Sequence, residues 1–436
     1  MTTTTPVDVD AARALGGPEW LNARRVAAAE KLDDLVWPTD SEEVWRYSRV
    51  NQFDLAQYRP MTADELGAPE EESAPGGGPV AAELGERAAL IVVRDGRVVH
   101  HELDDELVAQ GVTVCGIATC DADVVEPFLG TVSGASPDAF TVLHDAFLAG
   151  GAFVRVPRGV VVKRPIVVLH WAEGEGMASF PHTLVVADEG SEVTIVERHA
   201  SAPHVRHLVD SVVELVIGDN AHVRHVSIQE YGDRTWSVAL QRAHLGRDAR
   251  LSSSAVALGG DYARLRTESR FDGPGAESDL LAVYFGDGNQ MHDFRTFQDH
   301  VAPRTRSDLL FKGAVEDTAR SVYSGLIRIR PDAQKVEATQ SNRNLVLTEG
   351  AGAESIPNLE IEADDVRCSH ASTVGPIDDD QRYYLESRGV RPADAERLIV
   401  LGFFEDVFSR LPVPALATPL RRAVHEKVGH LHGDAS

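Results

Sequence analysis

The sequence is poor in cysteine, in basic residues and in long apolar runs. Its three cysteines, Cys115, Cys120 and Cys368, are too few and too scattered for a disulfide framework, so we expect free thiols in a reducing, cytoplasmic compartment, with Cys115 and Cys120 as core residues. The 42 basic residues are outnumbered by 68 acidic ones, and the net charge of -26 disfavours nucleic acid and anionic membranes as partners. No run is long and apolar enough to span a bilayer, and residues 1–8 lack the features of a secretion signal.

Common signatures of nucleotide and catalytic sites are also missing. The sequence has no G-x-x-x-x-G-K-[ST] phosphate loop and no G-x-G-x-x-G fingerprint, so a partner would have to hydrolyse any ATP. It has no H-E-x-x-H, G-x-S-x-G or C-x-x-C motif, which removes the usual grounds for proposing a metalloprotease, an α/β-hydrolase or a dithiol redox enzyme. We therefore expect a chain without catalytic residues of its own.

The patterns that are present divide the chain into four segments. Residues 1–66 show a helical pattern, and residues 67–85 are rich in Gly, Pro and Glu, which is typical of a flexible linker. Residues 86–375 are predominantly β, beginning with two β-branched runs around an Asp-Gly pair at residues 95–96, a strong hairpin signal. Residues 376–436 return to a helical pattern. We predict a mainly β core between N-terminal and C-terminal helical domains.

A repeat of about 28 residues runs through the β region and favours a parallel β-helix, a solenoid in which each coil stacks on the last. A large β-sandwich is the alternative, because its strands also recur between turn signals. The repeat is marked by small or polar residues before strand-like runs at Ser191, Ala221, Ala249, Ala276, Thr305 and Ala333, which are 30, 28, 27, 29 and 28 residues apart.

The C-terminal segment predicts three helices, of which the second begins at Pro392 and carries an apolar stripe. This stripe either packs on the end of the solenoid or binds a partner protein. Its members are Leu398, Leu401, Phe404, Val407, Phe408 and Leu411.

Cys368 and His370 are the strongest candidates for a metal site. Alternation of apolar and acidic residues from Leu359 onward suggests one strand over residues 359–370, and two residues that are two apart on a strand share a face. A thiolate and an imidazole suit zinc, copper or iron-sulfur clusters, yet two ligands leave such a site incomplete, so the others must come from elsewhere in the fold or from another chain. The alternative is that Cys368 is a small buried hydrophobe and His370 a surface residue.

Other histidines of the β region are expected mostly at solvated, outward positions, although several coils together could collect a metal. These are His199, His204, His207, His222, His225 and His244, with His292 and His300 the stronger candidates because they lie nearest the closing coils.

Several stretches of the sequence resemble the SufB/SufD family of iron-sulfur cluster assembly scaffolds. They are residues 332–347, 357–370, 373–375 and 384–390, with weaker similarity at Ser307-Asp308, Phe311-Lys312-Gly313 and Trp45-Arg46-Tyr47. Within that family, Cys368-Ser369-His370 followed by Thr373-Val374-Gly375 is similar to the SufD branch.

The resemblance implies a right-handed parallel β-helix that pairs with SufB and binds the ATPase SufC through its C-terminal helices, where we expect Phe404, Phe408 and Leu411 to make contact. It implies that Cys368 and His370 hold iron or a transient Fe-S cluster shared with SufB, and that this chain binds no nucleotide. The family's usual His-Gly-Ala-Thr reads His370-Ala371-Ser372-Thr373 here. Ala371 thus replaces a glycine, and its methyl group restricts the backbone conformations open to a turn at this point.

Two alternative functions are considered. The first is a SufB-like or homodimeric scaffold that works without SufB, or exists as a homodimer in isolation, which co-purification would reveal. The second is a β-helix enzyme acting on polysaccharides, with Glu362, Asp364 and Asp365 as candidate acids. Neighbouring carboxylates on one strand alternate faces and cannot all address one bond, which weighs against the second alternative.

Overall fold

The computed structural model describes residues 7–62, 65, 86–132 and 138–429. The linker predicted at residues 67–85 lies outside these ranges. None of the helices in the described part of the chain combines the length and the apolar character needed to cross a bilayer.

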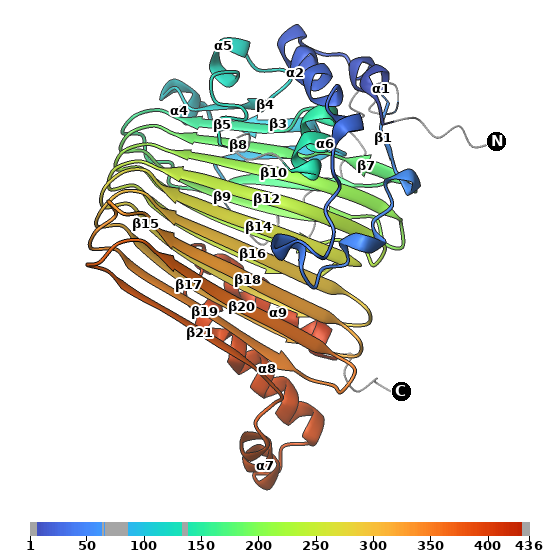
Figure 1. The fold of residues 1–436 in the computed structure, drawn as a ribbon, viewed down its shortest axis with the longest axis vertical. Coiled ribbons are helices and arrows are strands. Elements are labelled where there is room, and N and C mark those ends of the chain that lie inside the picture. The colour runs from blue at the N-terminus through green and yellow to red at the C-terminus, as the bar shows by residue number, and fades with distance from the viewer. Residues whose placement is uncertain (1–6, 63–64, 66–85, 133–137, 430–436) are drawn as a thin grey trace, which may run out of the picture.

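The centre of the molecule is a parallel β-solenoid whose successive strands alternate between two stacked sheets (Figure 1). Sheet A is built from β5 (Ala152–Val156), β8 (His182–Ala187), β10 (His207–Ile217), β12 (Thr235–Leu245), β14 (Tyr262–Phe271), β16 (Met291–His300), β18 (Arg320–Ile329) and β20 (Gly352–Ile361). Sheet B is built from β6 (Ile166–Ala172), β9 (Glu192–Ser201), β11 (His222–Glu230), β13 (Arg250–Ala257), β15 (Glu277–Gly286), β17 (Arg306–Val315), β19 (Glu337–Val346) and β21 (Arg367–Gly375).

The 28-residue repeat corresponds to these coils, so the prediction of a parallel β-helix is confirmed and the β-sandwich alternative is wrong. Each repeat residue from Ser191 to Thr305 immediately precedes a strand of sheet B, and Ala333 lies shortly before β19. All six side chains are at most 1% exposed, because each fills the inside of a coil corner where a larger side chain would not fit.

Shorter strands extend the first edge of each sheet. β2 (Ala89–Arg94) and β3 (Arg97–Leu103) form the predicted hairpin, and Asp95 and Gly96 adopt φ values of 49° and 86°, as a type I′ turn requires. β4 (Thr113–Gly116) pairs antiparallel with β5, while β1 (Arg59–Pro60) and β7 (Met177–Ser179) pair beside β10.

Cys115 and Cys120 form a disulfide, so the expectation of free thiols is wrong for this pair. A turn after β4, in which the backbone N–H groups of Thr119 and Cys120 both donate to the Gly116 carbonyl, brings the two Cα atoms within 5.7 Å. That separation is within the range that a disulfide spans.

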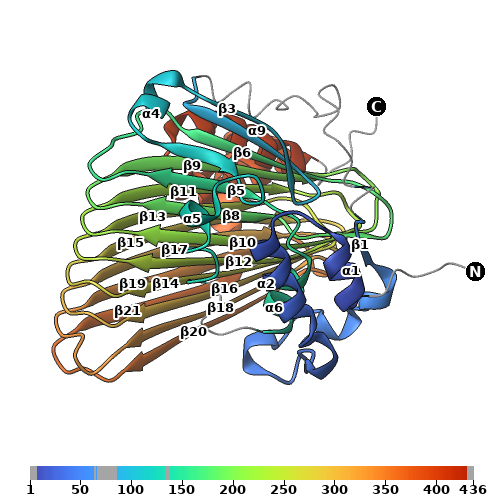
Figure 2. The same cartoon turned by 90° about the horizontal axis from the view of Figure 1, so that it is seen from above.

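The outer faces of the two sheets are covered by helices on opposite sides of the solenoid (Figure 2). Sheet A is covered by α1 (Val9–Ala14), α2 (Glu19–Ala29) and α6 (Ala139–Phe147), and sheet B by α8 (Pro392–Phe408) and α9 (Ala417–Gly429). α7 (Asp379–Ser387) lies beyond β21, and α4 (Asp105–Ala109) and α5 (Ala122–Val125) precede the regular coils.

The N-terminal region is less regular than its apolar pattern predicted. After α2, short 3₁₀ turns replace a continuing helix, namely η1 (Leu32–Asp34), η2 (Glu43–Trp45), η3 (Val50–Gln52) and η4 (Leu55–Gln57). Trp45 and Val50 are buried against sheet A from separate turns, and the Arg264 guanidinium stacks 3.7 Å from the Trp45 ring centroid. Contacts with the sheet therefore override the local helical preference.

Gly313 provides a test of how tightly the solenoid interior is packed. A Cβ at this position of β17 would lie 1.9 Å from Cε2 of Tyr284 and 2.6 Å from Oδ1 of Asn344. We expect Gly313→Ala to lower the free energy of unfolding by about 1–3 kcal/mol in a urea titration, because the core must shift. Gly375→Ala is the matched control, since its Cβ meets nothing within 4 Å, and equal stability of the two variants would contradict this packing.

Candidate functional site

Cys368 and His370 lie on β21, the last strand of sheet B, which has a paired neighbour on only one side in the described structure. The prediction of one strand over residues 359–370 is wrong, because β20 ends at Ile361 and residues 362–366 turn the chain from sheet A to sheet B. Cys368 and His370 still share one face, because both belong to β21 and are two residues apart. The candidate acids Glu362, Asp364 and Asp365 lie in that turn.

The register of β21 places the two donors over the open end of the solenoid interior. Cys368 pairs with Ala338 and His370 with Gln340, and both β19 partners are at most 2% exposed. Cys368 is half-buried and packs against the last apolar layer of the core, whereas His370 is exposed. The donors therefore sit at the rim between the core and a free strand edge.

The Cys368 thiol is held in its protonated form in the isolated chain. Burial raises its pKa, and a hydrogen bond with the Ala338 backbone offsets this only in part. Within the described residues, Cys368 and His370 do not belong to any group of three potential ligands. An arriving metal ion would have to displace the thiol proton and would need ligands beyond these two side chains.

Ala371 and Ser372, which replace the family's Gly-Ala, fit a regular strand. β21 stays in register with β19 through Gly375, and Ala371 is not among the described residues with positive φ. The Ser372 hydroxyl lies 2.7 Å from that of Ser355, which links β21 to β20. The methyl group at Ala371 is thus accommodated without a strained backbone.

A buried polar column runs along β19 below the donors, which the sequence analysis did not identify as part of the site. The Tyr284 hydroxyl donates to Asn344 at 2.6 Å, and Asn342 donates to the same hydroxyl at 2.9 Å. Next to His370, both side-chain amide atoms of Gln340 are buried without a hydrogen-bond partner among the described residues. Beside the last apolar layer, the inward positions of β19 from Gln340 to Asn344 are therefore polar.

Most of the predicted solvated histidines are in fact buried. His199, His207, His225, His292 and His300 are all at most 7% exposed, and of the named set only His204, His222 and His244 reach solvent appreciably. Burial lowers the pKa of His199, His292 and His300 to about 3, which keeps them neutral.

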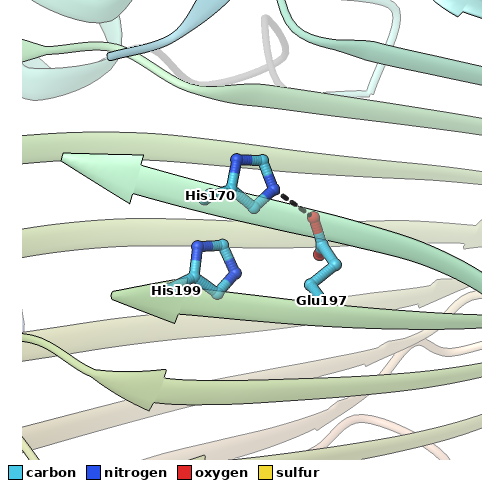
Figure 3. A group of neighbouring side chains, drawn as sticks. All are labelled: His170, Glu197 and His199. Atoms are coloured by element: carbon cyan, nitrogen blue, oxygen red, sulfur yellow. Dashed lines mark hydrogen bonds and ion pairs between the residues drawn. The ribbon is translucent and has the colours of Figure 1, made fainter. Parts of the chain in front are cut away.

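His292 and His300, the two stronger candidates, have structural partners. His300 bonds through both ring nitrogens, to Thr305 at 2.7 Å and Ser307 at 3.0 Å, and His292 bonds the Phe285 carbonyl at 3.2 Å. The histidine and acidic side chains that do gather are His170, Glu197 and His199, inside the early coils (Figure 3). His170 and Glu197 were not singled out from the sequence.

The three residues expected at the ATPase contact are buried within the chain. Phe404, Phe408 and Leu411 are 0%, 2% and 6% exposed, and they pack against the outer face of sheet B rather than on the end of the solenoid. These three side chains therefore pack within the chain, and they do not form a surface for a partner. Leu398, on the same helix, is 52% exposed.

A surface groove lies along the exposed side of α8 and α9. It has a volume of about 480 Å³ and combines apolar with charged lining, including the Arg421 and Glu405 ion pair at 2.6 Å. The other lining residues are Leu398, Leu401, Gly402, Arg422 and His425.

Two residues of β17, in stretches similar to the SufB/SufD family, fix α8 and the residues just after it to the solenoid. Lys312 donates to the Phe403 carbonyl at 2.7 Å and to Asp406 at 2.6 Å, and Asp308 accepts from Arg410 at 2.6 Å. In sheet B, β17 is separated from β21 only by β19. The C-terminal helices are thus coupled through two strand pairings to the strand that carries Cys368.

Glu316, immediately after β17, is a buried carboxyl group near Lys427 of α9. Burial raises its pKa to about 8, assisted by the carboxylates of Asp317 and Asp287 and opposed by Lys427 of α9. The folded state therefore holds this proton more tightly than the unfolded chain, whose pKa is near 4.5, so stability is lost as pH rises between these values.

We expect Glu316→Gln to flatten this decline, which should be on the order of 1 kcal/mol per pH unit at its steepest. The measurement is urea unfolding at several pH values between about 5 and 8. The exposed Glu349→Gln is the matched control. A wild-type slope retained in Glu316→Gln would show that another group titrates.

The fold and the site together define a β-solenoid scaffold with a thiol and an imidazole on an open strand edge. A family model of the SUF system FeS cluster assembly SufBD core domain matches residues 170–403, and one of the SufBD protein N-terminal region matches residues 14–168. The chain belongs to the SufBD family of iron-sulfur cluster assembly proteins.

Curated relatives agree with this assignment. The chain is 31% identical over 420 residues to the iron-sulfur cluster assembly protein SufD of Bacillus subtilis, with 94% of each chain covered. It is 35% identical over 299 residues to an iron-sulfur cluster assembly SufBD family protein of Mycobacterium tuberculosis, covering 66% of this chain and 73% of the relative. A SufBD family protein of Staphylococcus saprophyticus is 27% identical over 415 residues, with 91% and 87% covered.

Proposed function

We propose that this chain is the SufD-type, non-catalytic subunit of a cytoplasmic complex that builds iron-sulfur clusters with SufB and the ATPase SufC. The observation that carries the proposal is the pair Cys368 and His370, which shares one face of the free edge strand β21 and lacks a third ligand among the described residues. A SufB edge strand beside β21 would supply the missing ligands, and the nascent cluster is cargo shared between the two chains.

SufC is proposed to bind the exposed side of α8 and α9, at the groove that includes Leu398 and Leu401. Movement of the ATPase would then reach the cluster site through Lys312 and Asp308, which tie α8 to β17. β17 pairs with β19, and β19 pairs with β21. A displacement of α8 would therefore shift the edge strand where SufB is proposed to dock.

Co-expression of this chain with SufB and SufC, followed by affinity purification through a tag on this chain, tests the proposal. We expect both partners to be retained in fixed stoichiometry, and ATPase activity to be present only when SufC is present. A chain that purifies alone as a homodimer, with a cluster and without affinity for SufB, would instead support the homodimeric scaffold.

A further inference from the structure

The interior of the early coils holds a second group of potential metal ligands. In the register of β6 and β9, His170 lies directly opposite His199, and their rings stack with centroids 4.4 Å apart and planes 1° from parallel. Glu197 is two residues before His199 and so shares its inward face. Figure 3 shows both rings with one nitrogen on the side of the Glu197 carboxylate.

Glu197 is held by hydrogen bonds from three directions. Its Oε1 lies 3.0 Å from His170 Nε2 and accepts from the Thr183 hydroxyl at 2.5 Å, while its Oε2 lies 2.6 Å from His225 Nε2. Thr183 comes from sheet A and His225 from the next coil of sheet B. Outer partners of this kind orient the carboxylate of a metal site and fix it in one rotamer.

The two stacked imidazoles have unused hydrogen-bonding capacity. Nδ1 of His170 and Nδ1 of His199, on the ring edges away from Glu197 (Figure 3), are buried without a partner among the described residues, and His199 is only 7% exposed. Nothing bonded to Nδ1 therefore fixes either ring against rotation, and Nε2 is the nitrogen on the Glu197 side. A cavity of about 50 Å³ adjoins His199; its lining is mostly apolar, with polar side chains from Ser227, Gln229 and Ser237 among others. This volume holds a few water molecules.

The charge of the group is also uncompensated by basic side chains. Glu197 is 0% exposed, and in the described part of the chain neither Lys nor Arg pairs with it. Its hydrogen-bond donors stabilise the buried carboxylate in part, and a protonated histidine or a bound cation would neutralise its charge.

We propose that His170, Glu197 and His199 bind one divalent first-row transition metal ion of the zinc or iron(II) type inside the solenoid. One potential ligand atom of each residue lies within 4.8 Å of the other two. Because an imidazole binds a metal in the plane of its ring, one of the two parallel rings has to rotate about its Cβ–Cγ bond when the ion binds. Two imidazoles and one carboxylate form a ligand set with open positions that suits either ion, and water in the adjoining cavity would fill those positions. The ion replaces the proton between His170 Nε2 and Glu197, while His225 remains an outer partner of the carboxylate.

This site is separate from the proposed cluster site and does not depend on it. Five strands of sheet B, β11 to β19, lie between β9 and β21, which corresponds to roughly 30 Å at the usual spacing of paired strands. The two sites can therefore be tested independently.

The test is expression of the full chain in cobalt-supplemented minimal medium, because loading during folding does not require entry into a closed solenoid. After gel filtration in the presence of a weak chelator, metal content is measured by mass spectrometry and coordination by visible absorption. We expect about one Co²⁺ per chain with ligand-field bands, and a loss of most of that metal in His199→Ala and in Glu197→Gln.

Two controls address surface binding and folding. His204→Ala removes an exposed histidine of the following turn, and Cys368→Ala removes the free thiol, so both should keep the metal and its spectrum. Circular dichroism checks that each variant is folded, and bound metal should raise the melting temperature of the wild type but not of folded Glu197→Gln. A wild-type chain without cobalt, or a folded His199→Ala variant with unchanged metal content and spectrum, would overturn the proposal. The contact of His170 with Glu197 would then be a structural ion pair and no metal site.

Discussion

Replacing Cys368 with alanine is expected to lower iron-sulfur cluster formation by the assembled complex at least about tenfold, because the proposed shared site would lose one of its ligands. His370→Ala should act in the same direction. Neither change should abolish assembly of the complex, since pairing of a partner strand with β21 uses backbone groups and each substitution shortens a single side chain. Cluster formation is followed by visible absorption during anaerobic incubation with iron and sulfide.

Ser369→Ala is the matched control for both variants, because Ser369 lies between them on β21 and points to the opposite face. It should assemble clusters at the wild-type rate. A Cys368→Ala and His370→Ala double variant that retains full cluster formation would remove both residues from the mechanism.

Phe404→Ala is expected to lower the free energy of unfolding by about 3–5 kcal/mol, the range for emptying a buried aromatic site. Phe404 is 0% exposed between α8 and sheet B, so its loss opens a cavity at the base of the C-terminal helices. Urea unfolding of the full chain measures this effect. Any weakening of SufC binding in this variant follows from loosened helices, because the side chain itself does not reach the surface.

Leu398→Ala separates binding from packing on the same helix. Leu398 is 52% exposed and lines the surface groove, so its truncation should change stability by less than about 0.5 kcal/mol. We expect it to weaken SufC binding about tenfold in calorimetry, as loss of an apolar interface anchor does. Unchanged affinity in Leu398→Ala would place the ATPase contact elsewhere. Truncation after Gly389 is a poorer test, since it would strip α8 and α9 from the core.

The architecture was predictable from the sequence because each coil corner needs a small buried residue. Ser191 and Thr305 mark such corners as clearly as the alanines do, and their spacing equals one turn of the solenoid. The second C-terminal helix was predictable because its apolar residues recur at helical spacing. The sequence of an apolar helix face does not show whether that face packs on the solenoid or binds a partner. The tertiary contacts of Phe404 show that it packs on sheet B.

The candidate site was predictable only in part. Cys368 and His370 are two residues apart, so a strand of any register gives them one face. The turn at residues 362–366 was missed because Ala363 continues the alternation of Leu359 and Ile361, although Val366 is out of phase with it; in the structure both Ala363 and Val366 pack against the last core layer. Apolar residues at a coil corner therefore imitate strand alternation.

The buried histidine group was missed because polar residues on strands were expected to face solvent. The sequence does hold a signal, since Glu197 and His199 continue the even spacing of Val193 and Ile195, whose side chains fill the solenoid core. Alternation relative to a known inward residue predicts orientation better than polarity does.

The central claim is that Cys368 and His370 are half of a site that another chain completes. The most direct measurement is anaerobic reconstitution with ⁵⁷Fe and sulfide, followed by Mössbauer spectroscopy, on the isolated chain and on its complex with SufB and SufC. We expect a cluster spectrum from the complex and none from the isolated chain. A stable cluster on the isolated chain that disappears in Cys368→Ala, or an unchanged cluster in a complex carrying that substitution, would contradict the shared site.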